Sequence, residues 1–308
     1  MSILFFQPIA RKAIWGHTLV KDYFGYDEFP LGVGQSWSFS AQENASNKCS
    51  SEPYKGKTLL ELWKNHQELF GHPNEDFPVI ISLVAPEDDL SIQVHPDDEH
   101  AKKIGFKSGK NEAWYFIETA ENANIVYGHN AKDEKDLYHY INEERWDDLI
   151  RHLDVHAGDF VYLPAGLLHA LRKGSIVYEI QQATDITYRF YDYHRQDSEG
   201  NERELHLKQA VDCLSYNKQG PENNISPKVN TFEHYQETIY ISNDSFTVTK
   251  LEINGQDRYI CDNYQLATVI KGKGRVDNID VKLGDNFLIP RNTRVQLDGQ
   301  MIIMMTTK

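Results

Sequence analysis

The chain has 308 residues, of which 40% are hydrophobic and 25% are charged, and its formal net charge is −14 at pH 7. This composition is that of a globular protein with a substantial core, and it excludes a disordered, collagen-like or coiled-coil chain. The acidic balance argues against nucleic acid or an anionic membrane as the main partner, so an anionic ligand would need a local basic pocket.

Three helical segments are predicted from the spacing of apolar residues. In the first, Thr58 and Glu61 make a capping box and Gly71 follows the last helical residue. The expected helices span Lys57–Phe70, Asp133–Leu153 (as two short helices) and Leu205–Leu214.

Most of the remaining chain is rich in Val, Ile, Tyr and Phe between turn residues, which predicts strands. The polar, turn-rich stretch Ser215–Asn230 is the predicted boundary between a domain of residues 1–225 and a domain of residues 226–308. The expected strands are Phe77–Leu83, Ala113–Glu118, Asn124–Tyr127, Asp159–Leu163, Ser175–Gln181, Ile186–Tyr191, Thr238–Ser242, Phe246–Ile253, Leu266–Ile270, Asn286–Ile289 and Met301–Thr306.

An internal repeat relates residues 155–171 to residues 281–297. Both copies carry Gly-Asp, with a proline six residues after the glycine. Two copies in a β-rich chain predict a mainly β fold with two related β-sandwich units. Five residues after the proline, the first copy has His169 and the second has Val295, so the second unit lacks that potential ligand. The segment KGKGR (271–275) is expected to be a hairpin turn and not a phosphate loop, because no helix follows it.

Three cysteines, Cys49, Cys213 and Cys261, form no CxxC pair and no disulfide framework. Such sparse usage favours a reducing compartment. The N-terminal apolar run is too short for a signal peptide, and the most apolar segment, residues 77–86, is too short to span a bilayer. We therefore expect a cytoplasmic protein that has no membrane contact.

A candidate metal site comes from two strand segments and one turn. Gln93 and His95 alternate with apolar residues and so share one face of a strand, Glu112 opens another strand, and His169 follows a Pro-Ala-Gly turn. Taken singly, His95 and Glu112 could be surface residues. Nitrogen and oxygen ligands without cysteine suit Zn²⁺, with Mn²⁺, Fe²⁺ or Co²⁺ as alternatives.

Charged residues around the same segments could form a substrate site. Alternation places Asp185 and Arg189 on one strand face, where the arginine could bind phosphate or stabilise an oxyanion, or could simply pair with Asp185. Glu179 lies ten residues upstream and could face the same cavity. Lys110, two residues before Glu112, could meet an anionic substrate group.

The spacing Gly158-x5-Pro164-x-Gly166-x2-His169 resembles the second signature motif of cupin β-barrels, whereas Gln93 departs from the usual first motif. Over nearly its whole length the chain resembles the type I phosphomannose isomerases in their shorter bacterial form. The motifs that carry this resemblance are IWGH (14–17), KGKTLLELW (55–63), DDLSIQVHPDDEHA (88–101), GKNEAWY (109–115), PAGLLHAL (164–171), TYRFYDYHR (187–195) and RELHLKQAV (203–211).

The resemblance implies a zinc-dependent aldose–ketose isomerase that interconverts mannose 6-phosphate and fructose 6-phosphate through a cis-enediol(ate). It also implies a jelly-roll catalytic domain with helical insertions and a second, metal-free jelly-roll domain. One zinc ion per chain would be held by Gln93, His95, Glu112 and His169, with Gln93 as the most variable ligand. We expect a monomer or a weak homodimer.

The same resemblance implies roles for the other polar residues. Lys110 and Arg189 match basic residues assigned to substrate and transition-state contacts. Glu179 and Asp185 match acidic residues proposed for acid/base roles, and the sequence does not decide which group takes the C2 proton. Ser91 matches a position associated with the substrate phosphate.

Two positions depart from the family pattern. Ser82 stands where the family usually has a lysine, and Gln35 stands where a Gly-Glu-x-Trp motif has its glutamate. Both changes remove charge from the expected site, so a different substrate profile is conceivable. The alternatives are therefore a non-catalytic sugar-phosphate-binding cupin, an isomerase for a related sugar phosphate, or another cupin enzyme such as a metal-dependent dioxygenase.

Overall fold

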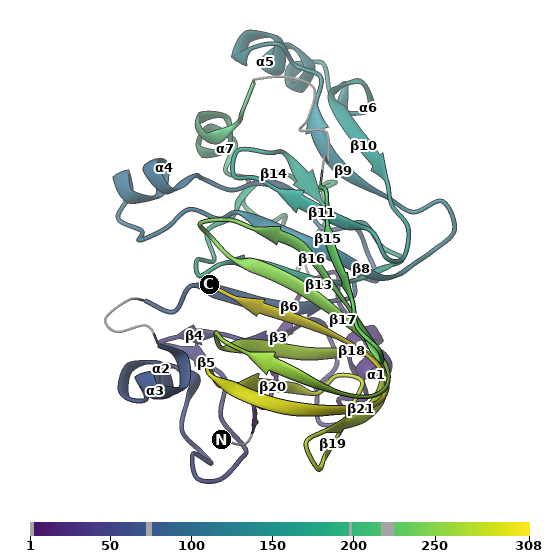
Figure 1. Ribbon diagram of the computed structural model, residues 1–308. Coiled ribbons are helices and arrows are strands. Elements are labelled where there is room, and N and C mark those ends of the chain that lie inside the picture. The colour runs from purple at the N-terminus through teal and green to yellow at the C-terminus, as the bar shows by residue number, and fades with distance from the viewer. Residues whose placement is uncertain (1–2, 72–75, 197–198, 217–224) are drawn as a thin grey trace.

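The computed structural model describes residues 3–71, 76–196, 199–216 and 225–308. These residues form a mainly β protein with short helices around the sheets, which confirms the predicted fold class (Figure 1). Among the described helices, none is long and apolar enough to cross a membrane.

Two antiparallel sheets make the first unit. One has six strands in the order β11 (Phe160–Leu163), β8 (Glu112–Thr119), β13 (Ser175–Gln182), β6 (Val79–Val84), β3 (Val33–Phe39) and β2 (Ile9–Lys12). The other has five strands in the order β10 (Ile150–Asp154), β9 (Asn124–His129), β12 (His169–Ala170), β7 (Ile92–Val94) and β14 (Tyr188–Tyr191). A two-stranded ribbon consists of β4 (Ala41–Gln42) and β5 (Ala45–Ser46).

Successive side chains along a strand point to opposite sides, so each of the two sheets has an inner face and an outer face. Trp114 and Val177 of the six-stranded sheet meet Tyr127 and Leu171 from the five-stranded side in one buried cluster, which is the core between the sheets. Ile92 and Val94 point the other way, into a cluster beneath three helices. These helices are α5 (Glu134–Asn142), α6 (Trp146–Leu149) and α7 (Leu207–Cys213).

The outer face of the six-stranded sheet packs against three helices and against the second unit. Tyr178 of β13 lies in this cluster with Phe246 and Met304 from the C-terminal part of the chain. The Tyr178 hydroxyl is 3.1 Å from Thr306 Oγ1 in a buried contact. The helices that share this cluster are α1 (Leu19–Phe24), α2 (Leu59–Asn65) and α3 (Gln67–Phe70).

The second unit is a single antiparallel sheet. Its order is β1 (Leu4–Phe5), β20 (Asn286–Ile289), β18 (Gln265–Val276), β21 (Thr293–Thr307), β17 (Thr247–Cys261), β16 (Tyr235–Ser242) and β15 (Lys228–Thr231), with β19 (Ile279–Lys282) paired to β18. Leu4 pairs with Leu288, so the second unit's sheet includes residues from the start of the chain.

A row of three glycines crosses this sheet where its long strands bend. Gly255 pairs with Gly299, which pairs with Gly274. A Cβ atom on Gly299 would lie 2.6 Å from the Cα atom of Gly274, and its φ of +134° is a conformation that side chains rarely adopt. Leu251 and Tyr259, from the two halves of β17, consequently reach the same apolar core.

The predicted helices are found with changed limits. The Thr58–Glu61 capping box is present, but the first helix is interrupted at His66, which ends α2 and precedes α3. The second prediction was wrong beyond Leu149, because residues 150–154 pair with β9 as strand β10. The third helix is confirmed as α7. Sequence reasoning missed two six-residue helices, α1 and α4 (Asp98–Lys103).

Each predicted strand overlaps an observed one, and the differences lie in length. The prediction Phe246–Ile253 covers only the first half of β17, because Gly255 bends the strand without ending it. The segment 271–275 was wrongly expected to be a turn: it lies inside β18, and the turn follows at Asp277, which has φ +56°. The strand predicted over Ile186–Tyr191 begins only at Tyr188.

The two copies of the internal repeat form turns of the same kind. Asp159 Oδ2 accepts a hydrogen bond from the backbone N–H of His156 at 2.8 Å, and Asp285 Oδ2 accepts one from Lys282 at the same distance. Val295 is buried in the apolar core of the second unit. The predicted domain boundary centres on residues 217–224, which lie outside the described residues, so the division into 1–225 and 226–308 stays a prediction.

Candidate metal centre and its surroundings

Three side chains predicted as ligands converge between the two sheets of the first unit. His95 directly follows β7, Glu112 opens β8, and His169 opens β12. One potential ligand atom from each lies within 4.8 Å of the others. Each residue is only about 1% exposed, so the group is inside the protein.

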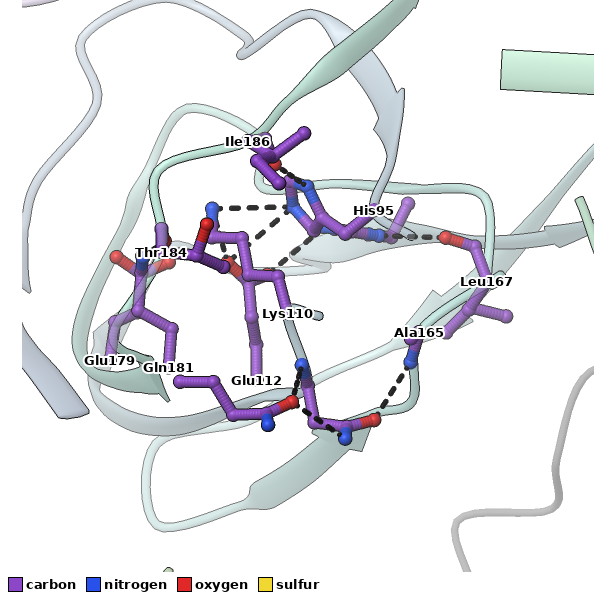
Figure 2. A network of polar contacts seen from close by, with 12 residues as sticks. His95, Lys110, Glu112, Ala165, Leu167, Glu179, Gln181, Thr184 and Ile186 are labelled. Atoms are coloured by element: carbon purple, nitrogen blue, oxygen red, sulfur yellow. Dashed lines mark hydrogen bonds and ion pairs between the residues drawn. The ribbon is translucent and has the colours of Figure 1, made fainter. Parts of the chain in front are cut away.

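Both histidines are oriented by backbone carbonyl groups. His95 Nδ1 lies 2.8 Å from the Ile186 oxygen, and His169 Nδ1 lies 2.9 Å from the Leu167 oxygen (Figure 2). A carbonyl oxygen can only accept, so each Nδ1 carries the hydrogen and each Nε2 keeps its lone pair. The two Nε2 atoms face Glu112, at 3.5 Å for His95 and 3.1 Å for His169. This is the arrangement of metal-binding imidazoles.

Lys110 completes the charge pattern. Its Nζ lies 2.8 Å from Glu112 Oε1 and 3.4 Å from His95 Nε2. Burial alone would raise the pKa of Glu112, but Lys110 and His95 outweigh it and hold that pKa well below its usual range. Burial, with Lys110, lowers the pKa of His95 to about 4. The carboxylate is therefore ionised and His95 is neutral, which are the forms that bind metals.

The donor atoms fit a divalent metal ion. Within the described part of the chain, both carboxylate oxygens of Glu112 and the Nε2 atom of His169 are buried without a well-aligned hydrogen bond. Buried polar atoms of this kind require an explanation, and nitrogen and oxygen donors match zinc and similar ions. Gln93 pairs with His169 across the sheet and thus shares its face. Its role as a ligand stays a prediction.

Asn111 ties the ligand-bearing elements together. Its backbone N–H and its side-chain amide donate to Gln182 Oε1 at 2.9 and 2.8 Å. Its Oδ1 accepts from the backbone N–H of Ala165 at 2.9 Å, in the turn that leads to His169 (Figure 2). Gln182 in turn donates to Asp98 at 3.2 Å. The acidic segment 97–99 thus contributes a structural bond through Asp98 and also caps α4 through Asp97.

Glu179 is a second buried carboxyl group with a different environment. It accepts from the Trp114 indole N–H at 2.9 Å and from the Gln35 amide at 3.0 Å. Burial, reinforced by the charge of Glu112, raises the pKa of Glu179 to about 7. Trp114 was not singled out from the sequence, although it stands two residues after Glu112 on the same strand and so shares its face.

The two positions that depart from the family pattern are neighbours. The Gln35 amide, besides binding Glu179, donates to Ser82 Oγ at 2.9 Å. The charges expected at these two positions have opposite signs. Their joint replacement by an amide and a hydroxyl leaves the net charge of the neighbourhood unchanged, and in this chain the two side chains are in direct contact.

Arg189 lies in the same cross-strand row as Gln93 and His169. Its terminal nitrogen Nη1 donates to the Glu204 carbonyl at 2.7 Å, and its Nε is buried with no hydrogen-bond partner among the residues that the structure describes. The alternative of an Arg189–Asp185 ion pair was wrong: Asp185 precedes β14 and lies 3.7 Å from Arg11. Arg189 therefore has a guanidinium nitrogen free to meet an anion.

Arg11 and Ser91 border the site in different ways. Arg11 stacks over the Trp37 ring at 4.1 Å and pairs with Gln35 on the neighbouring strand. No local pattern marked it, because its acidic partner is far away in sequence. Ser91 is buried two residues before Gln93, and its contact with a substrate phosphate stays a prediction.

Comparison with known proteins gives consistent matches. Residues 3–127 match the catalytic domain of type I phosphomannose isomerase, and residues 236–308 match the cupin domain of mannose-6-phosphate isomerase. The putative mannose-6-phosphate isomerase YvyI of Bacillus subtilis is 38% identical over 302 residues, covering 94% of this chain and 93% of the relative. The mannose-6-phosphate isomerase of Streptococcus mutans is 36% identical over 308 residues, covering 98% and 96%.

Solved structures agree with these matches. The crystal structure of the mannose 6-phosphate isomerase from Bacillus subtilis has a TM-score of 0.95 at 35% identity, with both chains fully covered. A phosphomannose isomerase from Salmonella typhimurium shares the fold, with a TM-score of 0.78 at 13% identity and both chains fully covered.

Proposed function

Because the chain belongs to the type I phosphomannose isomerase family, we propose that it interconverts mannose 6-phosphate and fructose 6-phosphate, with zinc as its metal. The observation that best supports this proposal is the buried group of His95, Glu112 and His169 directly beside Lys110. A metal group next to a fixed cation and near a carboxyl group of raised pKa suits proton transfer alpha to a carbonyl.

The zinc ion would be held by His95, Glu112 and His169, with Gln93 as a further ligand. When bound, Zn²⁺ supplies a Lewis acid for the oxygen atoms at C1 and C2 of the sugar. The neutral His95 and the ionised Glu112 are already in the forms that bind it.

Glu179 is the proposed base. Its carboxylate takes the C2 proton of mannose 6-phosphate, the C–H electron pair forms the C1–C2 double bond, and the carbonyl π pair moves to O1. After a proton passes from O2 to O1, the C2 carbonyl forms and Glu179 returns its proton to C1. A pKa near 7 suits a group that must accept and return a proton. Asp185 is less suited, because its side chain is 58% exposed and pairs with Arg11.

Lys110 and Arg189 supply positive charge for the anionic intermediate and for the substrate. Glu112 and Glu179 more than offset the effect of burial and raise the pKa of Lys110, so it stays a cation. Arg189 keeps its charge at any relevant pH and has an unpartnered Nε. Ser91 is the proposed contact for the phosphate group.

The deciding experiment is a coupled assay for fructose 6-phosphate formation by chelator-stripped protein, with and without added Zn²⁺. We expect no turnover without metal and restored turnover with zinc. Full activity after complete metal removal would contradict the proposal. Circular dichroism of the stripped protein shows whether the fold is intact.

A Glu179→Gln variant extends the test from the metal to the proposed base. We expect kcat to fall by at least about 100-fold, while zinc content stays unchanged. Saturable binding of mannose 6-phosphate by zinc-loaded wild-type protein without turnover would instead indicate a sugar-phosphate-binding protein. Turnover of a different sugar phosphate would indicate a related isomerase.

A further inference from the structure

The side-chain amide of Gln35 bridges two residues on neighbouring strands. Its Nε2 lies 2.9 Å from Ser82 Oγ and 3.0 Å from Glu179 Oε2. An amide nitrogen carries two hydrogens, so both can be used here, one for each partner. Gln35, Ser82 and Glu179 come from β3, β6 and β13, which are adjacent in the six-stranded sheet.

Sheet register makes this contact a fixed part of the fold. Glu179 pairs with Ser82 on one side and with Trp114 on the other, so the three side chains share one face. Ser82 is completely buried. The Trp114 indole donates a hydrogen bond to Oε1 of Glu179, and the Gln35 amide donates one to Oε2. Both oxygen atoms of the carboxyl group are therefore fixed in position.

Both of these donors are uncharged, and neither can take up a proton. A cation in their place would favour the ionised carboxylate and weaken it as a base. With N–H groups on both oxygens, a proton taken from a substrate can reside only on the carboxyl lone pairs that Trp114 and Gln35 leave free. The arrangement thus fixes both the direction and the basicity of the carboxyl group.

We infer that Gln35, anchored by the hydroxyl of Ser82, is a positioning residue that orients Glu179 for proton transfer. The inference rests on the proposed isomerase function. It adds that two uncharged residues on the neighbouring strands, neither of them a metal ligand, control the turnover step and not the affinity for substrate.

The first test is Gln35→Met, which keeps the length of the side chain and removes both N–H donors. We expect kcat for mannose 6-phosphate to fall by about tenfold or more, the usual effect of losing a hydrogen bond to a charged group. KM and zinc content should not change. Gln42→Met is the matched control, because Gln42 is also half-buried but donates to the carbonyl of Ala183 at 3.0 Å.

A charge exchange makes the test specific. Gln35→Glu places a second carboxylate against Glu179, so one of the two retains a proton and kcat should fall further than in Gln35→Met. Adding Ser82→Lys gives the new carboxylate a cation, and the double variant should recover at least about tenfold of the lost kcat. A purely structural role for Gln35 predicts no such recovery.

Ser82→Ala tests the anchor without inserting a large side chain. We expect a smaller loss, about two- to fivefold in kcat, because the Gln35–Glu179 bond remains. Ser38→Ala is its control, since Ser38 is equally buried in β3 and its hydroxyl has no hydrogen-bond partner.

The outcomes separate this inference from the proposed function. Wild-type protein that binds zinc but does not isomerise mannose 6-phosphate would remove the proposed function and the inference with it. Active wild-type protein with an unchanged kcat in Gln35→Met would overturn only the inference. A raised KM with unchanged kcat would also overturn it, because Gln35 would then bind substrate instead of positioning Glu179.

Discussion

Two glutamates in one site have opposite proton affinities because their neighbours differ. Glu112 contacts Lys110 and approaches two imidazoles, and its pKa lies well below the usual range. Glu179 is equally enclosed, but its direct partners are the uncharged Trp114 and Gln35, and its pKa is raised to about 7. Burial raises the pKa of both carboxyl groups, and the outcome differs because Lys110 and His95 outweigh burial at Glu112, whereas burial prevails at Glu179.

The raised pKa of Glu179 predicts the pH dependence of turnover. Below its pKa the carboxyl group is protonated and cannot accept the C2 proton, so kcat should fall as the pH drops through about 7 and level off above it. The measurement is the kcat of zinc-loaded protein as a function of pH, between about pH 5 and about pH 9. A kcat that stays level down to about pH 5, as expected for a carboxyl group with the ordinary glutamate pKa of about 4.3, would contradict this role.

Local spacing was sufficient to predict three residues that converge as a candidate metal site, but not all of their partners. Gln93 and Glu112 lie on strands whose alternation can be read from sequence, whereas His95 directly follows β7. The same reasoning did not place Asp185 correctly, because residues 184–187 belong to no strand and β14 begins only at Tyr188. Its partner Arg11 belongs to the far edge of the other sheet, which no local pattern records.

At the scale of elements, Asn111 holds β8, β13 and the turn before β12 in one arrangement. We expect Asn111→Ala to weaken zinc binding by about 10- to 100-fold, the usual effect of losing a group that orients metal ligands. Competition with a chelator of known affinity measures this directly.

Asn130→Ala is the control for Asn111→Ala. The Asn130 side-chain amide likewise makes a hydrogen bond across the fold, donating to the backbone carbonyl of Asp148 at 2.9 Å, but it is exposed. Equal zinc affinity in both variants would show that the Asn111 bonds do not orient the ligands.

Element limits were predicted less well than element types, for identifiable reasons. The helix predicted over residues 57–70 has a continuous apolar face, but His66 adopts φ −130° and divides it while its ring contacts Lys57 and Glu68. Ile150 has the apolar character of a helix residue, yet it pairs with His129 in a sheet. Tertiary pairing outweighed local preference in the second case.

At the scale of the whole molecule, one core joins the two units. Phe246 is fully buried in the cluster that includes Tyr178 of the first unit and the helices above it. All five tryptophans precede residue 225. Four of them lie away from the second unit's sheet, whereas the Trp63 ring packs edge-on against Tyr264, with ring centroids 5.8 Å apart. Tryptophan fluorescence therefore reports mainly on the first unit and its contact with the second, whereas far-ultraviolet circular dichroism reports on the strands of both.

This distribution allows a test of cooperativity. We expect Phe246→Ala to lower the free energy of unfolding by about 3–5 kcal/mol and to shift the denaturation midpoint of both signals together. Separate transitions, with an unchanged tryptophan signal, would show that the two units unfold independently.

The pairing of β1 with β20 also has a consequence for synthesis on the ribosome. Leu4 is synthesised 284 residues before its partner Leu288. At about 5–20 residues per second, this interval is on the order of 15 to 60 s. During that time β1 has no partner strand. The sheet of the second unit can be completed only after β20 has been made, so the speed of translation sets how long the apolar residues of β1 stay unpaired.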